Sequence, residues 1–121
     1  GSRLLPEDRL PDVGGAILNA VAEFGRQVGP PIQPREVTII HGAAKGADAI
    51  AERIATVFGF NVYRFPAEWA ALGRRAGSLR NTEMLDTMSP DVVLAFPMPG
   101  SVGTWDMVRK AKARGVPVRV L

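Results

Sequence analysis

A short strand pattern followed by a glycine-rich loop and a helix occurs twice, and this repeat constrains the fold more than any other feature. The first copy has a β-branched run over residues 37–40, glycines within residues 42–48 and a helical pattern that ends at Gly59. The second copy has an apolar run over residues 91–96, then a glycine- and proline-rich loop and a helix that Gly115 ends. Short uninterrupted apolar runs are typical of strands buried on both faces of a parallel sheet.

The rest of the chain continues this alternation. Apolar residues recur at helical spacing over residues 11–28, and prolines within residues 30–34 separate that helix from the first strand. Further elements are predicted as follows: strands over 61–65 and 116–121, a short helix over 81–88, and an irregular or partly helical segment over 66–78 that Gly73 and Gly77 interrupt. Alternation of this kind implies right-handed crossovers. It predicts an α/β fold, with a Rossmann-like, doubly wound parallel sheet in three α/β/α layers.

The beginning of the chain does not match this fold. Doubly wound domains normally begin with a strand that becomes central in the sheet, whereas this chain opens on Gly1-Ser2-Arg3 and enters a helix. We therefore expect a first strand ahead of Gly1. The alternative is that Gly1 and Ser2 are a cloning scar.

Composition limits the class of protein. The 121 residues fit a single domain over residues 1–121, with the hydrophobic and charged content of a globular protein. There is no apolar run long enough to suggest a membrane span. The sequence has no cysteine, which excludes disulfides and thiolate chemistry and fits a reducing cytoplasm. A single histidine excludes a multi-histidine metal site. The net charge of +3 favours anionic partners, from nucleotides to nucleic acid.

The two glycine-rich loops are candidate phosphate-binding sites. Each precedes a helix, whose first N–H groups and positive dipole end attract anions. In a parallel sheet both loops fall on the carboxyl edge, where ligands bind. Neither loop is a standard dinucleotide-binding or P-loop motif, since Gly46 is followed by Ala47 and Asp48. Either glycine set could also serve the geometry of a tight turn alone.

Four segments resemble the YspA/cpYpsA-related branch of the SLOG superfamily. Residues 42–48 resemble its G-G-A-x-G-A-D motif, residues 77–84 its G-x-x-R-N-x-x-M segment, and residues 96–104 its F-P-x-x-x-G-x-G-T loop. Residues 1–3 resemble the G-S-R that closes the first strand of the family. The order and spacing match along essentially the whole chain, which favours a strand ahead of Gly1 over a cloning scar.

This resemblance implies a Rossmann-like sheet, a nucleotide-class ligand, and a homodimer or higher oligomer. No cofactor beyond that ligand is firmly implied, and no metal site is expected, since the sequence has one histidine and no cysteine. The motif positions expected to bind the ligand are Gly1, Ser2, Arg3, Gly42, Ala43, Gly46, Asp48, Arg80, Asn81, Pro97, Gly100, Ser101, Gly103 and Thr104. The superfamily includes phosphoribohydrolases, molybdenum-cofactor carriers, DNA-processing proteins and sensors, so the fold does not settle the function.

The catalytic glutamate of the phosphoribohydrolases has no counterpart in this sequence. In their P-G-G-x-G-T-x-x-E motif the final glutamate corresponds to Met107, and Asp106 would point about 100° away on a helix. We therefore expect a binding module that acts as sensor, carrier or sequestering protein, rather than an enzyme. One alternative is a nucleotide N-glycosidic hydrolase, with Asp106, Asp48 or Glu83 as the carboxylate. The other is single-stranded DNA binding, with stacking on Trp69 and Trp105.

Each polar candidate also has a structural interpretation. Arg80 could clamp a phosphate bidentately, or it could be a surface arginine near a helix start. Asp48 could contact a ribose hydroxyl, or it could cap its own helix. For His41 a structural hydrogen bond at a strand end is favoured over a role as general base, since no partner is evident.

The remaining candidates lie in or near the later helices. Trp105 could also pack against a neighbour, and Trp69 could shield a pocket. The arginines at 74, 75 and 80 could steer an anion or be solvated. Met84 and Met88 are predicted to be core residues at helical spacing.

Overall fold

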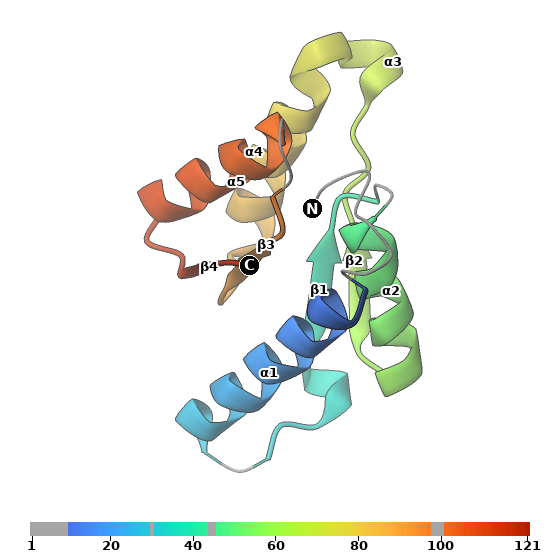
Figure 1. The fold of residues 1–121 in the computed structure, drawn as a ribbon. Helices are drawn as coiled ribbons and strands as arrows, with labels where there is room; N and C mark the ends of the chain where they lie inside the picture. Colours follow the sequence, from blue (N-terminus) through green and yellow to red (C-terminus); the bar gives the residue numbers. More distant parts are fainter. Residues whose placement is uncertain (1–9, 30, 44–45, 98–100) are drawn as a thin grey trace.

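The elements of the chain fall into two groups, which Figure 1 shows side by side. The computed structural model describes residues 10–29, 31–43, 46–97 and 101–121. The first group comprises α1 (Leu10–Val28), η2 (Pro34–Glu36), β1 (Thr38–His41), α2 (Ala47–Phe58) and β2 (Asn61–Arg64). The second comprises α4 (Ala76–Met88), β3 (Val93–Ala95), α5 (Val102–Ala113) and β4 (Val118–Val120). Between them lie α3 (Trp69–Leu72) and η3 (Gly73–Arg75).

The strands pair in parallel, as the alternation of elements predicted. β1 pairs with β2 from Thr38↔Asn61 to His41↔Arg64, and β3 pairs with β4 from Val93↔Val118 to Ala95↔Val120. The mixed α/β class with short parallel strands is therefore confirmed. The described strands nevertheless form two separate two-stranded sheets, because no described strand joins β1 to β3. The expected single sheet in three layers is thus not completed by the described residues.

The first group is held together by an apolar cluster. The inward stripe of α1 contributes Val13 and Ile17, and the first turns of α2 contribute Ala47 and Ile50. Phe96, which follows β3, completes the cluster and connects it to the second group. Burying a large aliphatic side chain contributes about 1.5–3 kcal/mol. Packing of this stripe, rather than helix propensity, therefore fixes α1 on α2 and β1.

The segment predicted to be irregular, residues 66–78, is largely helical. It contains α3, η3 and the start of α4, which begins at Ala76, five residues before Asn81. Gly73 interrupts the helical path with a φ of 60°, as a glycine break should. Gly77 does not interrupt it, because it lies within α4 where Trp69 packs over the backbone. A Cβ at Gly77 would be 3.1 Å from Cη2 of Trp69.

The expected core role of the two methionines on α4 needs adjustment. Met84 and Met88 share one face of α4, but both are only half-buried and line a cavity, so they are not core residues. The reason is that the apolar face of α4 looks into this space rather than onto another element. Separately, no helix within the described ranges has the length and apolar character to cross a membrane.

Candidate ligand-binding site

The loops that follow β1 and β3 border one cavity of about 1240 Å³. β1 ends at His41 and leads through Gly42 and Ala43 to the start of α2. β3 ends at Ala95 and leads through Phe96 to the start of α5. The first turns of both helices and the middle of α4 line the same cavity. The carboxyl edge that the sequence predicted as the binding edge is therefore hollow.

Most of the predicted ligand-binding residues that the structure describes line this cavity. Those that line it are Gly42, Ala43, Asp48, Arg80, Asn81, Ser101, Gly103 and Thr104. Gly46 and Pro97 are described but are not among its lining residues. Gly1, Ser2, Arg3 and Gly100 lie outside the described residues. Segments 38 residues apart, at Gly42 and Arg80, thus meet at one place.

Arg80 joins the ends of the first two strands. Its Nη1 donates to the carbonyl oxygens of Gly42, at 2.9 Å, and of Phe65, at 3.3 Å. Its Nε donates to Oδ1 of Asn81 at 3.0 Å. Burial lowers the pKa of Arg80 and the nearby charge of Asp48 raises it in part, but a guanidinium stays protonated in proteins. Nη2 makes no hydrogen bond to any described residue, so it is the nitrogen left to meet an anion.

Arg80 also explains why residue 42 is glycine. A Cβ built at Gly42 would overlap Nη1 of Arg80 and lie 2.5 Å from its Cζ. The guanidinium therefore lies directly against the backbone where β1 ends. Gly103 differs, since a Cβ there meets nothing within 4 Å among the described atoms. Of these two motif glycines, one accommodates an arginine and the other leaves open space at the start of α5.

Asn81 is a buried link between α4 and α5. Its side chain is 4% exposed, and its Nδ2 donates to the carbonyl of Gly103 and to Oδ2 of Asp106, both at 3.1 Å. Its Oδ1 accepts from Arg80. Because both ends of the amide are occupied, Asn81 positions Arg80 relative to the first turn of α5.

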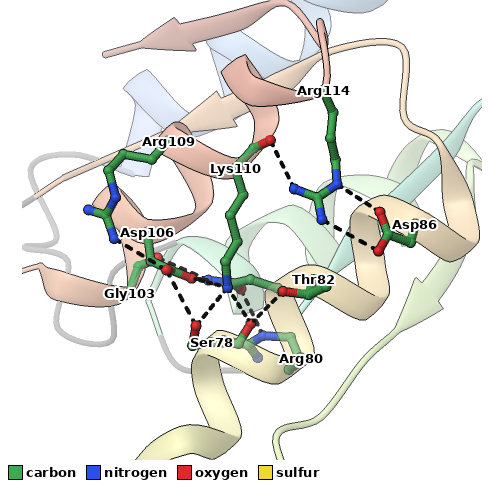
Figure 2. A network of polar contacts seen from close by, with 10 residues as sticks. Ser78, Arg80, Thr82, Asp86, Gly103, Asp106, Arg109, Lys110 and Arg114 are labelled. Carbon is green, nitrogen blue, oxygen red and sulfur yellow. Dashed lines mark hydrogen bonds and ion pairs between the residues drawn. The ribbon is translucent and has the colours of Figure 1, made fainter.

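Asp106 lies at the centre of the polar network between these helices (Figure 2). Besides Asn81, its carboxylate pairs with Nζ of Lys110 at 3.0 Å and with Nη2 of Arg109 at 3.3 Å, and it accepts from Oγ of Ser78 at 3.4 Å. Burial opposes ionisation, but the hydrogen bonds from Lys110 and Asn81 hold the pKa of Asp106 below its ordinary value. Asp106 is therefore a structural anion whose lone pairs are taken.

His41 is held by the loop it leads into. Its Nδ1 accepts the backbone N–H of Ala43 at 2.9 Å, so the structural hydrogen bond favoured for this histidine is present. Nε2 is buried without a hydrogen-bond partner among the described residues, 3.9 Å from Oε1 of Glu52. Burial lowers the pKa of His41, although the charges of Asp48 and Glu52 raise it in part. The ring is thus neutral at pH 7, with its proton on Nε2.

The two helices that begin at the cavity offer backbone donors. Gly46 is the N-cap of α2 and Ser101 that of α5, and neither makes a side-chain capping bond. Gly46, and not Asp48, occupies the N-cap position of α2. Asp48 is buried within the first turn of this helix. Gly46 has φ 78° and ψ −124°, a conformation that favours glycine. First-turn N–H groups without side-chain caps are suited to bind anions.

The three candidate carboxylates lie in different surroundings. Only Asp48 lines the cavity, since Asp106 is engaged between α4 and α5 and Glu83 is exposed on α4. No group of three potential metal ligands is found in the described part of the chain. Of the three candidates, the cavity is therefore lined by one buried carboxylate, that of Asp48.

Sequence reasoning missed several members of this network. The carbonyl of Phe65 and the side chain of Ser78 carried no motif signal of their own. The Asp106–Lys110 pair had one, because an acidic residue four positions before a lysine on a helix predicts an ion pair. Trp69, considered as a cover for the pocket, lines the cavity and is 55% exposed.

Comparisons with known proteins agree with the resemblance. Residues 16–71 match the model of the YspA, cpYpsA-related SLOG family. The chain is also similar to the Gene 61 protein of Mycobacterium phage D29, with 44% identity over 90 residues that cover 70% of this chain and 71% of that protein. No solved structure matches the chain.

Proposed function

Because the chain belongs to the YspA, cpYpsA-related SLOG family, we propose that it binds a nucleotide or nucleotide derivative at the carboxyl edge of β1 and β3. The observation that carries this proposal is the convergence of three anion-binding features on one cavity. These are the first turn of α2, the first turn of α5 and the half-buried guanidinium of Arg80. Family membership alone supports only the coarser statement, a domain of a nucleotide-ligand-binding family.

In this proposal the phosphate lies against the first turn of α5, near Gly103 and Thr104. Open space at Gly103 lets a phosphate oxygen approach the backbone N–H groups. Nη2 of Arg80 supplies a charged donor from α4, which lines the same cavity. Because Nε and Nη1 are already engaged, Arg80 acts through one terminal nitrogen rather than through a full bidentate fork.

We propose a binding role, as sensor, carrier or sequestering module, rather than hydrolysis. Cleavage of an N-glycosidic bond needs a carboxylate near the sugar carbon. Asp106 is saturated by four side chains, and Glu83 points to solvent outside the cavity. Asp48 is the remaining carboxylate, and in this proposal it faces a ribose hydroxyl.

The test is a binding screen by thermal shift and calorimetry against AMP, ADP, cyclic AMP, ADP-ribose, inorganic phosphate and adenosine. A ligand at one hundred times its dissociation constant stabilises the folded state by about 2.7 kcal/mol. We expect phosphorylated nucleosides to raise the unfolding temperature and adenosine to do so far less. Chromatography of the nucleotide after incubation separates a binder from a hydrolase, since a hydrolase releases free base.

Matched variants locate the site. Gly103→Val places a side chain in the open space at α5 and should abolish binding, whereas Gly15→Val, an exposed glycine on α1, should leave it unchanged. Arg80→Lys should weaken binding while keeping the charge. If a short single-stranded DNA binds and no nucleotide does, the cavity would instead be a site for single-stranded DNA. No response to any probe at millimolar concentration would refute the proposal.

A further inference from the structure

Trp69 is an aromatic residue of the cavity that the proposed phosphate site does not use. It is the first residue of α3 and lines the cavity, although 55% of its surface is exposed. Pockets for small ligands are commonly lined by aromatic side chains. Trp105, the other tryptophan of the sequence, is also exposed, but it does not line the cavity. The structure therefore distinguishes two tryptophans that no sequence pattern separates.

The ring of Trp69 packs on a glycine that the backbone of α4 does not require. Gly77 lies in the first turn of α4, and its φ is not positive, so any residue could adopt this conformation. Glycine also stabilises a helix less than alanine does. A Cβ at Gly77 would, however, lie 3.1 Å from Cη2 of Trp69. The missing side chain at position 77 thus makes room for the indole ring.

The indole meets Gly77 with its edge and not with a face. The atoms nearest to the position of a Cβ are Cη2, at 3.1 Å, and its two bonded neighbours Cζ2 and Cζ3, at 3.8 and 3.9 Å. Both neighbours are clearly more distant than Cη2, as for a point that lies near the plane of the ring. The aromatic ring pairs found among the described residues, Phe58–Phe60 and Tyr63–Phe65, do not include Trp69. The faces of this indole are therefore left for another flat group.

Trp69 and Arg80 are held close together by α4. Residues three apart on a helix are neighbours, so the ring over Gly77 lies about 5 Å along the helix axis from the level of Arg80. Arg80 also bonds the carbonyl of Phe65, and residues 66–67, which lead from there toward Trp69, line the same cavity. An indole about one helical turn from an arginine matches a nucleotide, because a single ribose separates its base from its phosphate.

From this arrangement we infer that Trp69 is the stacking platform for the base of the ligand and that Gly77 sets the position of the ring. The inference rests on the proposed function, since it assigns the base side of the same cavity. Every base has a π-face, so an indole selects an aromatic base without choosing among bases. The ligand class is therefore a phosphorylated nucleoside, and a sugar phosphate without a base lacks this contact.

The experiment compares AMP with ribose 5-phosphate, which keeps the sugar and the phosphate but has no base. Calorimetry measures both dissociation constants. We expect AMP to bind about tenfold more tightly or better, as is typical when a base stacks on an aromatic side chain. Trp69→Ala should remove this difference by weakening AMP alone, and Trp69→Phe should keep part of it.

A matched pair of glycine variants tests the position of the ring. Gly77→Ala should weaken AMP and leave ribose 5-phosphate unchanged, because the added Cβ displaces the indole of Trp69. Gly15→Ala is the control, since a Cβ at this helical glycine meets nothing within 4 Å among the described atoms. It should change neither dissociation constant. Unchanged binding of ribose 5-phosphate also shows that the Gly77→Ala protein is folded.

Tryptophan fluorescence reports the stacking itself. AMP should quench the emission of the wild type and of Trp105→Phe but not that of Trp69→Phe, and ribose 5-phosphate should quench none of them. Loss of quenching in Trp105→Phe instead would overturn the inference, because it would place the base beside α5.

The two proposals fail in different ways. Equal affinity of the wild type for AMP and ribose 5-phosphate, or equal weakening of both by Trp69→Ala, would overturn the base platform and leave the phosphate site standing. If neither compound binds at millimolar concentration, the proposed function fails and this inference fails with it.

Discussion

The two halves of the molecule are built alike but differ in the contacts between their helices. In the first half, α1 packs on α2 and β1 through aliphatic side chains around Val13 and Ile17. In the second half, α4 and α5 bury Leu85, Val108 and Ala111, and they also share a network of hydrogen bonds and ion pairs centred on Asp106 (Figure 2). The difference shows that a strand–loop–helix pattern fixes the backbone but not the kind of contact that stabilises it.

This difference has a functional side. Burial of apolar side chains is non-directional, so it does not fix how one side chain is oriented against the next. Each hydrogen bond in a polar network does fix the orientation of its donor and its acceptor. Arg80 is held from both halves: by Asn81, which also bonds the carbonyl of Gly103, in the polar half, and by the carbonyls of Gly42 and Phe65 in the apolar half. We infer that the apolar half supplies most of the stability and that Asn81 orients Arg80 from the polar half.

The largest effect should come from the apolar half. Ile17→Ala removes a 5% exposed side chain from the cluster and should lower the free energy of unfolding by about 2–5 kcal/mol. Urea unfolding followed by circular dichroism measures this. The control is Asn19→Ala on the exposed face of α1, which should change it by less than about 0.5 kcal/mol. Equal effects of the two variants would mean that the α1 stripe carries no special share of the stability.

A smaller loss is expected in the polar half. Asn81→Ala leaves a backbone carbonyl, a carboxylate and Nε of Arg80 without their partner, and should cost about 2–3 kcal/mol in the same measurement. It should also weaken nucleotide binding, since Arg80 loses its support, whereas Ile17→Ala should leave the affinity of the folded protein unchanged. Thr82→Ala, one position along α4, is the control. If Asn81→Ala spares both stability and binding, the network does not position the site.

The sequence predicted the helices and strands better than it predicted which contacts hold each half together. β-branched runs and helical spacing indicated every described strand and the helices α1, α2 and α5, but they indicated α4 only from Asn81 onward. Local patterns determine these elements. Gly77 was misjudged as a break because its cause, the ring of Trp69 above it, is a contact between segments eight residues apart. The glycine at 42 was attributed to ligand approach, whereas its nearest neighbour is an arginine 38 residues later. Such contacts leave no periodic signal.

Acid should distinguish the two halves by the pH at which each weakens. The pKa of His41 is lowered by burial, so the unfolded chain takes up the proton first, and the first half loses stability as the pH falls below about 6.5. The pKa of Asp106 is lowered by its hydrogen bonds, so its contribution is complete above about pH 4 and is lost as the pH falls through the lower folded-state value.

Urea midpoints measured from pH 8 to pH 3 test these two windows. His41→Asn should remove the decline that begins near pH 6.5, and Asp106→Asn should remove the decline below about pH 4. The Asp106→Asn protein should be less stable than the wild type at pH 7 and nearly equal to it at the acid end. A single acid transition, unchanged by either substitution, would contradict separate titration of the halves.

The smallest effect tests how closely the apolar half is packed, by means of two neighbouring glycines on α1. A Cβ at Gly15 meets nothing within 4 Å among the described atoms, so Gly15→Ala should stabilise the protein by about 0.5–1 kcal/mol through helix propensity and a restricted unfolded chain. A Cβ at Gly14 would lie 3.2 Å from Cδ1 of Ile54, which is tighter than ordinary van der Waals contact. Gly14→Ala should therefore lose most of that gain, because the Ile54 side chain must give way by a few tenths of an ångström. Thermal unfolding of the two single variants resolves the difference. If both variants gain the same stability, the Ile54 side chain can move without cost, and α1 is not closely packed on α2. The contrast between a close-packed apolar half and a polar half would then be wrong.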